Sequence, residues 1–168
     1  LKSYFLQGSY KMGGTAVKVL TFGGHEKTYQ SWYGVTKEQI KENRRQNPYT
    51  YENEIDNYKQ DHYQLHWNQK VNQKWSTNLG LNYTYGRGYF EQYREDDSVE
   101  TYGNIVSSDI DKNGTELGTT DLIRRRWLDN NFYVVNASAK YESKKINMTF
   151  SGSYSNYSGD HFGEVIWA

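Results

Sequence analysis

Hydrophobic and polar residues alternate with a period of two along most of this chain. The clearest run lies at 75–89, where Leu79, Leu81, Tyr83 and Tyr85 alternate with Gly80, Asn82, Thr84 and Gly86. Period-two alternation is typical of a β-strand whose two faces meet different surroundings. Six such runs predict six strands, at about 4–10, 15–24, 58–71, 75–89, 126–141 and 146–157.

The connections between these runs alternate in size. Short turns are expected at 11–14, 72–74 and 143–145, and long polar segments at about 25–57 and 90–124, the first with a short helix at 36–45. This order predicts an all-β fold, an antiparallel up-and-down meander. Short turns opposite long loops are typical of outer-membrane barrels, whereas soluble sandwiches space their turns more evenly. Six strands are too few to close a barrel, so we expect one part of a larger transmembrane β-barrel.

The two predicted faces differ in composition. One carries Leu, Val, Ala and Met, with Tyr and Trp near the strand ends, as a lipid-facing surface with interfacial aromatic residues would. The other carries Ser, Asn, Thr, Gln and Gly, as a water-filled passage would. The mean hydropathy of −1.02 suggests disorder, but 17 Tyr and 5 Trp argue against it.

Charge and cysteine usage narrow the function classes. The 20 basic and 20 acidic residues balance, so nothing indicates a nucleic-acid partner. The absence of cysteine excludes disulfides, zinc–thiolate sites and thiol nucleophiles. No catalytic motif is found, so we expect no enzyme and no cofactor. Neither end resembles a natural terminus, and we expect the chain to be a fragment.

Several separated segments resemble TonB-dependent outer-membrane receptors of the Bacteroidetes type. One is the run Gly-Gly-His-Glu-Lys-Thr-Tyr-Gln-Ser-Trp-Tyr-Gly at 23–34. The others lie at 1–6, 16–22, 56–66, 88–93, 120–130 and 159–168, in the same order. The resemblance covers nearly all of the chain except the middles of the two long segments.

The resemblance implies a 22-stranded barrel in the bacterial outer membrane, with a plug domain and a TonB box. The chain would be part of that barrel, with extracellular loops at about 25–57 and 90–124; the plug and the TonB box are absent from it. The implied function is TonB-dependent uptake of a scarce nutrient, such as a ferric siderophore, haem, cobalamin or an oligosaccharide. The implied partners are the TonB complex, reached through the missing N-terminal region, the extracellular ligand and outer-membrane lipid.

Aromatic residues in the long segments are candidate ligand contacts. Trp32, Tyr33 and Tyr93 can stack on a sugar ring or a catecholate, or can simply pack the loops together. His161 is expected near an extracellular strand end and is a further candidate.

Arg124 and Arg125 belong to a basic run at the foot of the second long segment. Guanidinium groups fit carboxylate and phosphate groups, so the run can capture an anionic siderophore or lipopolysaccharide phosphate. The alternative is salt bridging to nearby acids such as Asp121 and Asp129, which we favour.

Two metal hypotheses are weaker. Asp109, Asp111 and Asn113 have the spacing that opens a calcium-binding loop, but the expected Glu is missing at its end, which favours a plain turn. His62 and His66 share a strand face about 13 Å apart, at about 3.3 Å per residue, so they are expected to form hydrogen bonds and not to share a metal.

Two other functions stay open. A soluble β-sandwich that binds carbohydrate would also be rich in aromatic residues and free of cysteine. A porin-like or structural outer-membrane protein would share the barrel without energy coupling.

Overall fold

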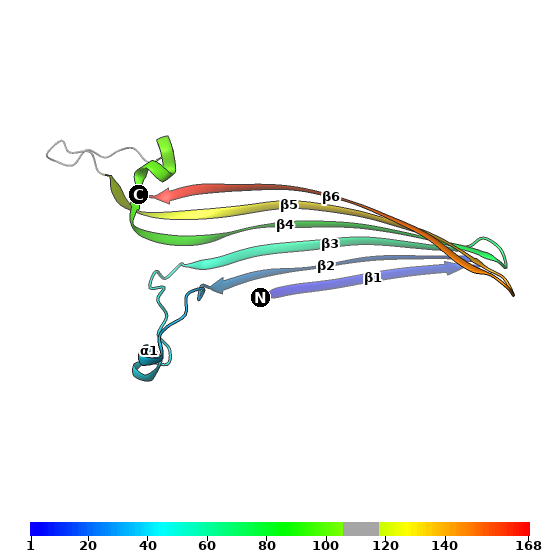
Figure 1. Cartoon of the computed structure of the whole chain (residues 1–168), viewed down its shortest axis with the longest axis horizontal. Helices are drawn as coiled ribbons and strands as arrows, with labels where there is room; N and C mark the ends of the chain where they lie inside the picture. The colour runs from blue at the N-terminus through cyan, green and yellow to red at the C-terminus, as the bar shows by residue number, and fades with distance from the viewer. Residues whose placement is uncertain (106–117) are drawn as a thin grey trace. The chain divides into compact units, whose positions relative to one another are not determined.

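A computed structural model describes residues 1–105 and 118–168. Its six strands form one sheet in the order β1-β2-β3-β4-β5-β6, an antiparallel meander, as expected (Figure 1). The strands are β1 (Lys2–Met12), β2 (Thr15–Tyr29), β3 (Ile55–Lys70), β4 (Trp75–Ser98), β5 (Thr119–Glu142) and β6 (Asn147–Trp167). A short helix, α1 (Lys37–Glu42), follows β2, and a 3₁₀ segment, η1 (Val99–Ile105), follows β4.

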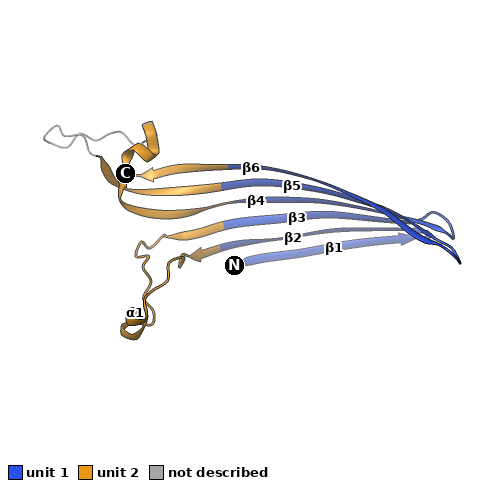
Figure 2. Cartoon of the chain, in the orientation of Figure 1, with its two compact units in different colours: residues 1–26, 58–87, 128–160 blue, residues 27–57, 88–127, 161–168 orange. Residues whose placement is uncertain are grey.

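The chain divides into two compact units, and each of the strands β2 to β6 contributes residues to both (Figure 2). Unit 1 comprises Leu1–Glu26, Tyr58–Arg87 and Leu128–Asp160. It holds the three short turns and the strand segments next to them. Unit 2 comprises Lys27–Asn57, Gly88–Trp127 and His161–Ala168, and it holds α1, η1 and the other strand ends.

Ring contacts in unit 1 assign the alternating residues to two faces. The amide face carries Phe22 stacked on His62, with centroids 4.4 Å apart. The apolar face carries a row of three tyrosines, in which Tyr83 stacks on Tyr63 at 5.9 Å and on Tyr133 at 4.8 Å. His62 and Tyr63 are successive residues of β3, and successive side chains of a strand point to opposite faces, so these contacts agree with the expected division into two faces.

The strands run further into the long polar segments than the sequence suggests. β4 ends at Ser98 and not near 89, β5 begins at Thr119 and not near 126, and β6 continues to Trp167. Polar and charged residues at these ends suggest loops, yet they face each other across the ladder and pair, as Arg125 does with Glu91. The long segments at about 25–57 and 90–124 are therefore reduced to 30–54 and 99–118.

The helix α1 begins where its capping residues dictate. The backbone N–H of Gln39 donates to Thr36 Oγ1 at 3.2 Å, and Gln39 Oε1 accepts from the Thr36 N–H at 2.8 Å. This reciprocal pair is a capping box. The helix ends at Glu42, because the backbone of the next residue, Asn43, is extended, so it is shorter than the expected 36–45. Among the described residues, no helix has the length and apolarity needed to cross a membrane.

Unit 1 has almost no buried interior. Of the described hydrophobic residues in this unit, Leu20 alone is buried. Large apolar side chains on the outer strands are open instead: Leu6 is 68% exposed and Phe150 is 60% exposed. An apolar sheet face normally packs against a second layer or against lipid, because apolar surface is unstable in water. Within unit 1 the described residues supply no such layer.

Candidate functional site

The amide face of unit 1 forms a shallow, uncharged groove of about 640 Å³. Most of its lining residues are aromatic or carry amides; they are Phe22, Tyr58, Gln60, His62, Gln64, Asn82, Thr84, Gly86, Asn130, Phe132, Val134, Asn136 and Tyr157. The Tyr157 hydroxyl donates to Asn130 Oδ1 at 2.6 Å, and Asn130 Nδ2 reaches the Tyr58 hydroxyl at 3.5 Å. This network lays two tyrosine rings across the groove and presents neutral donors and acceptors between them.

Glycines make room for these two rings. A Cβ atom at Gly86 would collide with the hydroxyl of Tyr58, and one at Gly159 would collide with the hydroxyl of Tyr157. The hydroxyl end of each tyrosine therefore lies against a glycine, and a larger residue there would displace the ring.

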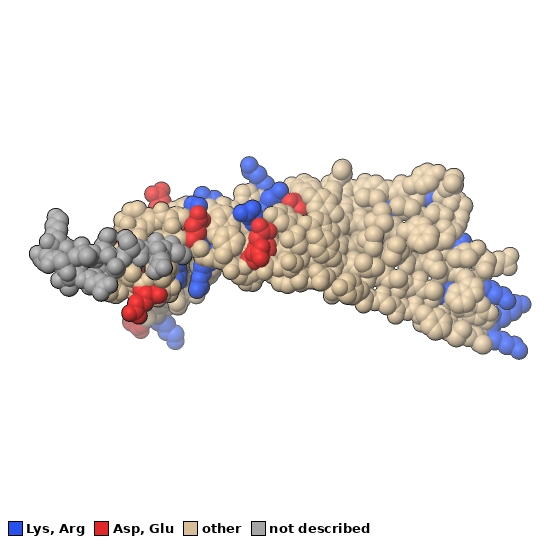
Figure 3. Space-filling model, turned by 90° about the horizontal axis from the view of Figure 1, so that it is seen from above, with Lys and Arg blue, Asp and Glu red and all other residues tan. Residues whose placement is uncertain are grey.

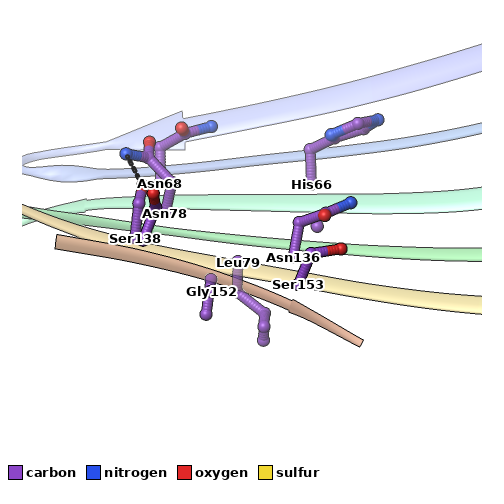
Figure 4. Close-up of a pocket in the computed structure, with 11 residues that line it drawn as sticks. His66, Asn68, Asn78, Leu79, Asn136, Ser138, Gly152 and Ser153 are labelled. Atoms are coloured by element: carbon purple, nitrogen blue, oxygen red, sulfur yellow. Dashed lines mark hydrogen bonds between the residues drawn. The ribbon is translucent and has the colours of Figure 1, made fainter. Parts of the chain in front are cut away.

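A second depression of about 440 Å³ lies on the amide face nearer the short turns (Figure 4). Asn78 Nδ2 donates to Ser138 Oγ at 3.2 Å there, while Leu79 points to the opposite side of the sheet. His66 Nε2 lies 3.1 Å from Gln64 Oε1, and His62 Nδ1 lies 3.0 Å from Thr84 Oγ1. Both histidines form hydrogen bonds on the amide face, as expected. No cluster of three metal-binding side chains occurs among the described residues.

The apolar face of unit 1 carries aromatic residues in two rows. The row of Tyr63, Tyr83 and Tyr133 lies toward the long connections. Nearer the short turns, Trp75 packs on Tyr141 with centroids 5.1 Å apart. Between the rows, an apolar depression of about 580 Å³ is lined by Trp67, Phe150 and Asn78 together with small and aliphatic residues.

Charged residues are missing between these rows. The segments 62–69, 75–86, 130–139 and 146–159, on four neighbouring strands, contain no Asp, Glu, Lys or Arg. On the face drawn in Figure 3, basic side chains gather at the short-turn end, and a broad uncharged surface adjoins them. The sheet thus carries an uncharged band that the sequence alternation alone does not reveal.

In unit 2, Glu91 is the centre of a buried hydrogen-bond cluster. It is 1% exposed. Glu91 Oε1 accepts from the Tyr51 hydroxyl at 2.7 Å and from Asn53 Nδ2 at 2.6 Å, and Oε2 pairs with Arg125 Nε at 2.8 Å. The cluster therefore attaches the long β2–β3 connection to β4 and β5.

The electrostatics of this cluster favour an ionised Glu91. Burial by itself would raise the pKa of Glu91, but the hydrogen bonds from Tyr51, Asn53 and Arg125 outweigh it and lower that pKa. Burial and the bond to Glu91 raise the pKa of Tyr51 to about 12. The pair is thus a carboxylate and a neutral phenol over the whole physiological range.

A second network fixes η1 in unit 2. Asp97 Oδ2 accepts from the Tyr102 hydroxyl at 2.7 Å and from Arg94 Nε at 3.0 Å. Arg124 Nη1 donates to that same hydroxyl at 2.7 Å, and Nη2 donates to Gln92 Oε1 at 2.9 Å. The hydrogen bond from Tyr102 is the largest of the effects that lower the pKa of Asp97. Arg124 is therefore held by groups of its own unit.

The two candidate arginines thus form internal pairs, as favoured, but with other acids than expected. Arg124 lies 3.7 Å from Asp97, and Arg125 pairs with Glu91 and covers the Tyr89 ring at 4.5 Å. Both arginines lie inside β5 and not at the foot of a loop, so the acids opposite them on β4 are their partners.

The aromatic candidates differ in exposure. Trp32 is 57% exposed and meets Phe90 edge-on at 4.7 Å, and Tyr33 is 70% exposed and stacks on Tyr49 at 5.9 Å. Tyr93 is half-buried and donates to Asp121 Oδ2 at 2.7 Å. Trp32 and Tyr33 therefore retain exposed ring surface, whereas the Tyr93 hydroxyl is used within the fold.

His161 lies on β6 and is exposed. The calcium candidate formed by Asp109, Asp111 and Asn113 lies outside the described residues.

Sequence reasoning missed Glu91 and Asp97. Their signal is present but faint: each is an acid in an extended run whose neighbouring strand carries the basic residues 124–126.

Comparison with protein-family models, with curated proteins and with solved structures finds no match to this chain.

Proposed function

We propose that this chain forms part of the wall of a transmembrane β-barrel in the bacterial outer membrane, and that the barrel is a receptor for TonB-dependent nutrient uptake. The observation that carries the first part is the uncharged band on unit 1, bounded by two aromatic rows on the apolar face. Lipid tails are the environment that such a band fits, because they stabilise uncovered aliphatic surface and exclude charge.

The spacing of the two rows supports this proposal. Trp75 and Tyr83 stand eight positions apart on β4, as do Tyr133 and Tyr141 on β5. Eight residues extend about 26 Å along a strand, and a tilt of about 40° reduces that height to about 20 Å. The apolar band of outer-membrane barrels is about 25 Å tall and is flanked by aromatic girdles.

The amide face fits the inner surface of such a wall. Its groove is polar but uncharged, with hydrogen bonds such as Tyr157 to Asn130 that would satisfy side chains beside water. Barrel interiors are polar, and strands alternate between apolar outside and polar inside. In this proposal, unit 2 supplies the extracellular connections.

The soluble β-sandwich alternative is less well supported. A sandwich buries its apolar face under a second sheet. The residues that the structure describes form one six-stranded sheet, and exposed residues such as Phe150 and Tyr154 remain on its apolar face.

The receptor part of the proposal rests on the resemblance of the segments at 23–34, 56–66 and 120–130. The cargo classes are those named above: a ferric siderophore, haem, cobalamin or an oligosaccharide. Trp32 and Tyr33 support ligand contact, since both expose aromatic surface in unit 2. The TonB complex would be engaged by a part of the receptor outside this chain.

A matched pair of substitutions on β4 tests the membrane assignment. Leu81→Arg places a charge on the apolar face, and Asn82→Arg places it on the amide face. In a lipid bilayer we expect Leu81→Arg to cost about 2–4 kcal/mol and to reduce the inserted fraction severely, with little effect of Asn82→Arg. Insertion into liposomes is measured by protease protection. Equal behaviour of the two variants, or a wild-type chain that stays monomeric in plain buffer, contradicts a membrane wall.

Uptake tests the receptor assignment separately. Cells that depend on the complete protein for iron-limited growth are expected to lose uptake of radiolabelled ferric siderophore when a protonophore collapses the inner-membrane proton gradient. The same assay with haem, cobalamin and oligosaccharides identifies the cargo class. Uptake of the cargo that is insensitive to the protonophore would favour a porin-like protein.

A further inference from the structure

The short-turn end of unit 1 is strongly basic. The segments 11–14, 70–74 and 140–145 contain six lysines and a single acid, Glu142. The chain as a whole has no net charge, so this concentration is local. Figure 3 shows basic side chains gathered at this end of the face drawn.

Backbone hydrogen bonds bring these segments side by side. The N–H of Lys70 donates to the carbonyl of Gly14 at 2.7 Å, and the N–H of Glu142 donates to the carbonyl of Lys74 at 2.8 Å. The three turns are therefore neighbours at one end of the sheet, and their lysines are grouped at that end.

Most of this positive charge is open to solvent. Lys140 pairs with Glu142, with Nζ 3.1 Å from Oε1, so that pair is neutral. The other five lysines are exposed; they are Lys11, Lys70, Lys74, Lys144 and Lys145. We call these five the turn-lysine surface.

An aromatic pair adjoins the turn-lysine surface. Trp75 follows Lys74 directly, is 37% exposed, and packs on Tyr141 on the apolar face. Indole and phenol rings partition to the boundary between lipid tails and headgroups, and lysine side chains extend from there toward the phosphates. In a bilayer, the aromatic pair would therefore lie at the acyl boundary of the phospholipids, and the lysines would lie at their headgroups.

We propose that the turn-lysine surface binds anionic phospholipid headgroups in the leaflet that the short turns face. This inference rests on the proposed membrane function and names a lipid partner for it. Charge complementarity selects anionic headgroups, since the surface carries no unpaired acid among the described residues. Each lysine near an anionic bilayer strengthens binding by roughly fivefold, so several together produce a clear preference over neutral lipid.

The test compares two triple variants of the full chain that lose the same charge. The test variant is Lys74→Gln, Lys144→Gln and Lys145→Gln in the turns. The control variant is Lys27→Gln, Lys37→Gln and Lys41→Gln in unit 2. Binding is measured by flotation with phosphatidylcholine vesicles and with vesicles that also contain phosphatidylglycerol, at low and high salt. Far-UV circular dichroism checks that each variant keeps its strand content.

The wild-type chain and the control variant are expected to prefer vesicles with phosphatidylglycerol, and the turn variant is expected to lose at least about tenfold of that preference. The preference should weaken at high salt. An equal loss in both variants overturns the inference, because any charge would then suffice. Insertion without any preference overturns it while leaving the membrane function intact. Failure to associate with either vesicle overturns both.

Discussion

Two buried glutamates in unit 2 show how the surroundings of a residue decide whether its charge is stabilised. Glu91 accepts hydrogen bonds from Tyr51, Asn53 and Arg125, which together lower its pKa against the effect of burial. Glu54 is also buried, but burial is the largest influence on it and raises its pKa, with Arg94 opposing. The fold therefore stabilises the charge of Glu91 and disfavours that of Glu54.

Amide substitutions at these two positions should have opposite consequences at neutral pH. Glu91→Gln leaves Arg125 without its buried carboxylate and is expected to lower the free energy of unfolding by about 3 kcal/mol. Glu54→Gln removes a charge that burial penalises and is expected to leave that free energy unchanged or raised. Urea unfolding of the detergent-refolded chain, followed by tryptophan fluorescence, measures both. Similar losses in the two variants would contradict the contrast.

The lowered pKa of Glu91 also predicts how the stability of unit 2 responds to acid. A carboxyl group whose pKa is lowered on folding stabilises the fold above its ordinary pKa of 4.5, and the stabilisation is lost as the pH falls through the folded value. Protonation of Glu91 should therefore destabilise unit 2 as the pH falls below about 4.5. Wild type should lose stability in that range, and Glu91→Gln should lose less. A pH profile that is the same in both would exclude Glu91 as the titrating group.

Residue-scale sequence reasoning found the right residue types but not their partners. Arg124 and Arg125 were expected to pair with Asp121 or Asp129, which are near them in sequence. Their partners are Asp97 and Glu91, because strand pairing places β4 residues opposite β5. Register between strands depends on long-range contacts, and a local pattern of charges does not specify it.

At the scale of the element, the period-two pattern specifies strands well and their ends poorly. It predicted β4 from 75 because aliphatic and polar residues alternate there, but it stopped near 89, where charged residues begin. β4 nevertheless continues to Ser98. The pairing of Glu91 with Arg125 and of Gln92 with Arg124 extends the ladder with polar residues. Composition alone does not separate such paired charges from a solvated loop.

The contact between Tyr58 and Gly86 gives a prediction for neighbouring strands. Gly86→Ala adds a methyl group where the Tyr58 hydroxyl lies, so the ring must move or the strands must separate. We expect a loss of about 1–3 kcal/mol in the free energy of unfolding. Gly152→Ala is the matched control, since a Cβ there meets nothing within 4 Å. Thermal unfolding in detergent compares the two, and equal midpoints would contradict the close contact.

At the scale of the whole chain, the sequence predicted one meander with two unlike faces, and the described residues form that sheet. It did not predict how sharply the charges are segregated, because the uncharged segments of four strands become one band only when they lie side by side. The proposed barrel of 22 strands would need strands in addition to these six. What the two faces contact is therefore the central question for the function.

A cysteine scan along β5 addresses that question directly, because the chain has no native cysteine. Single cysteines at Tyr133, Val135 and Ala137 would label the apolar face, and those at Val134 and Asn136 the amide face. In a barrel wall within liposomes, spin labels at 133, 135 and 137 should respond to dissolved oxygen in the bilayer. Labels at 134 and 136 should respond to a water-soluble relaxation agent. The collision rates should alternate with a period of two, since successive side chains point to opposite faces. If instead the labels at 133, 135 and 137 are shielded from both agents, the apolar face is covered by protein, and the proposed lipid contact is wrong.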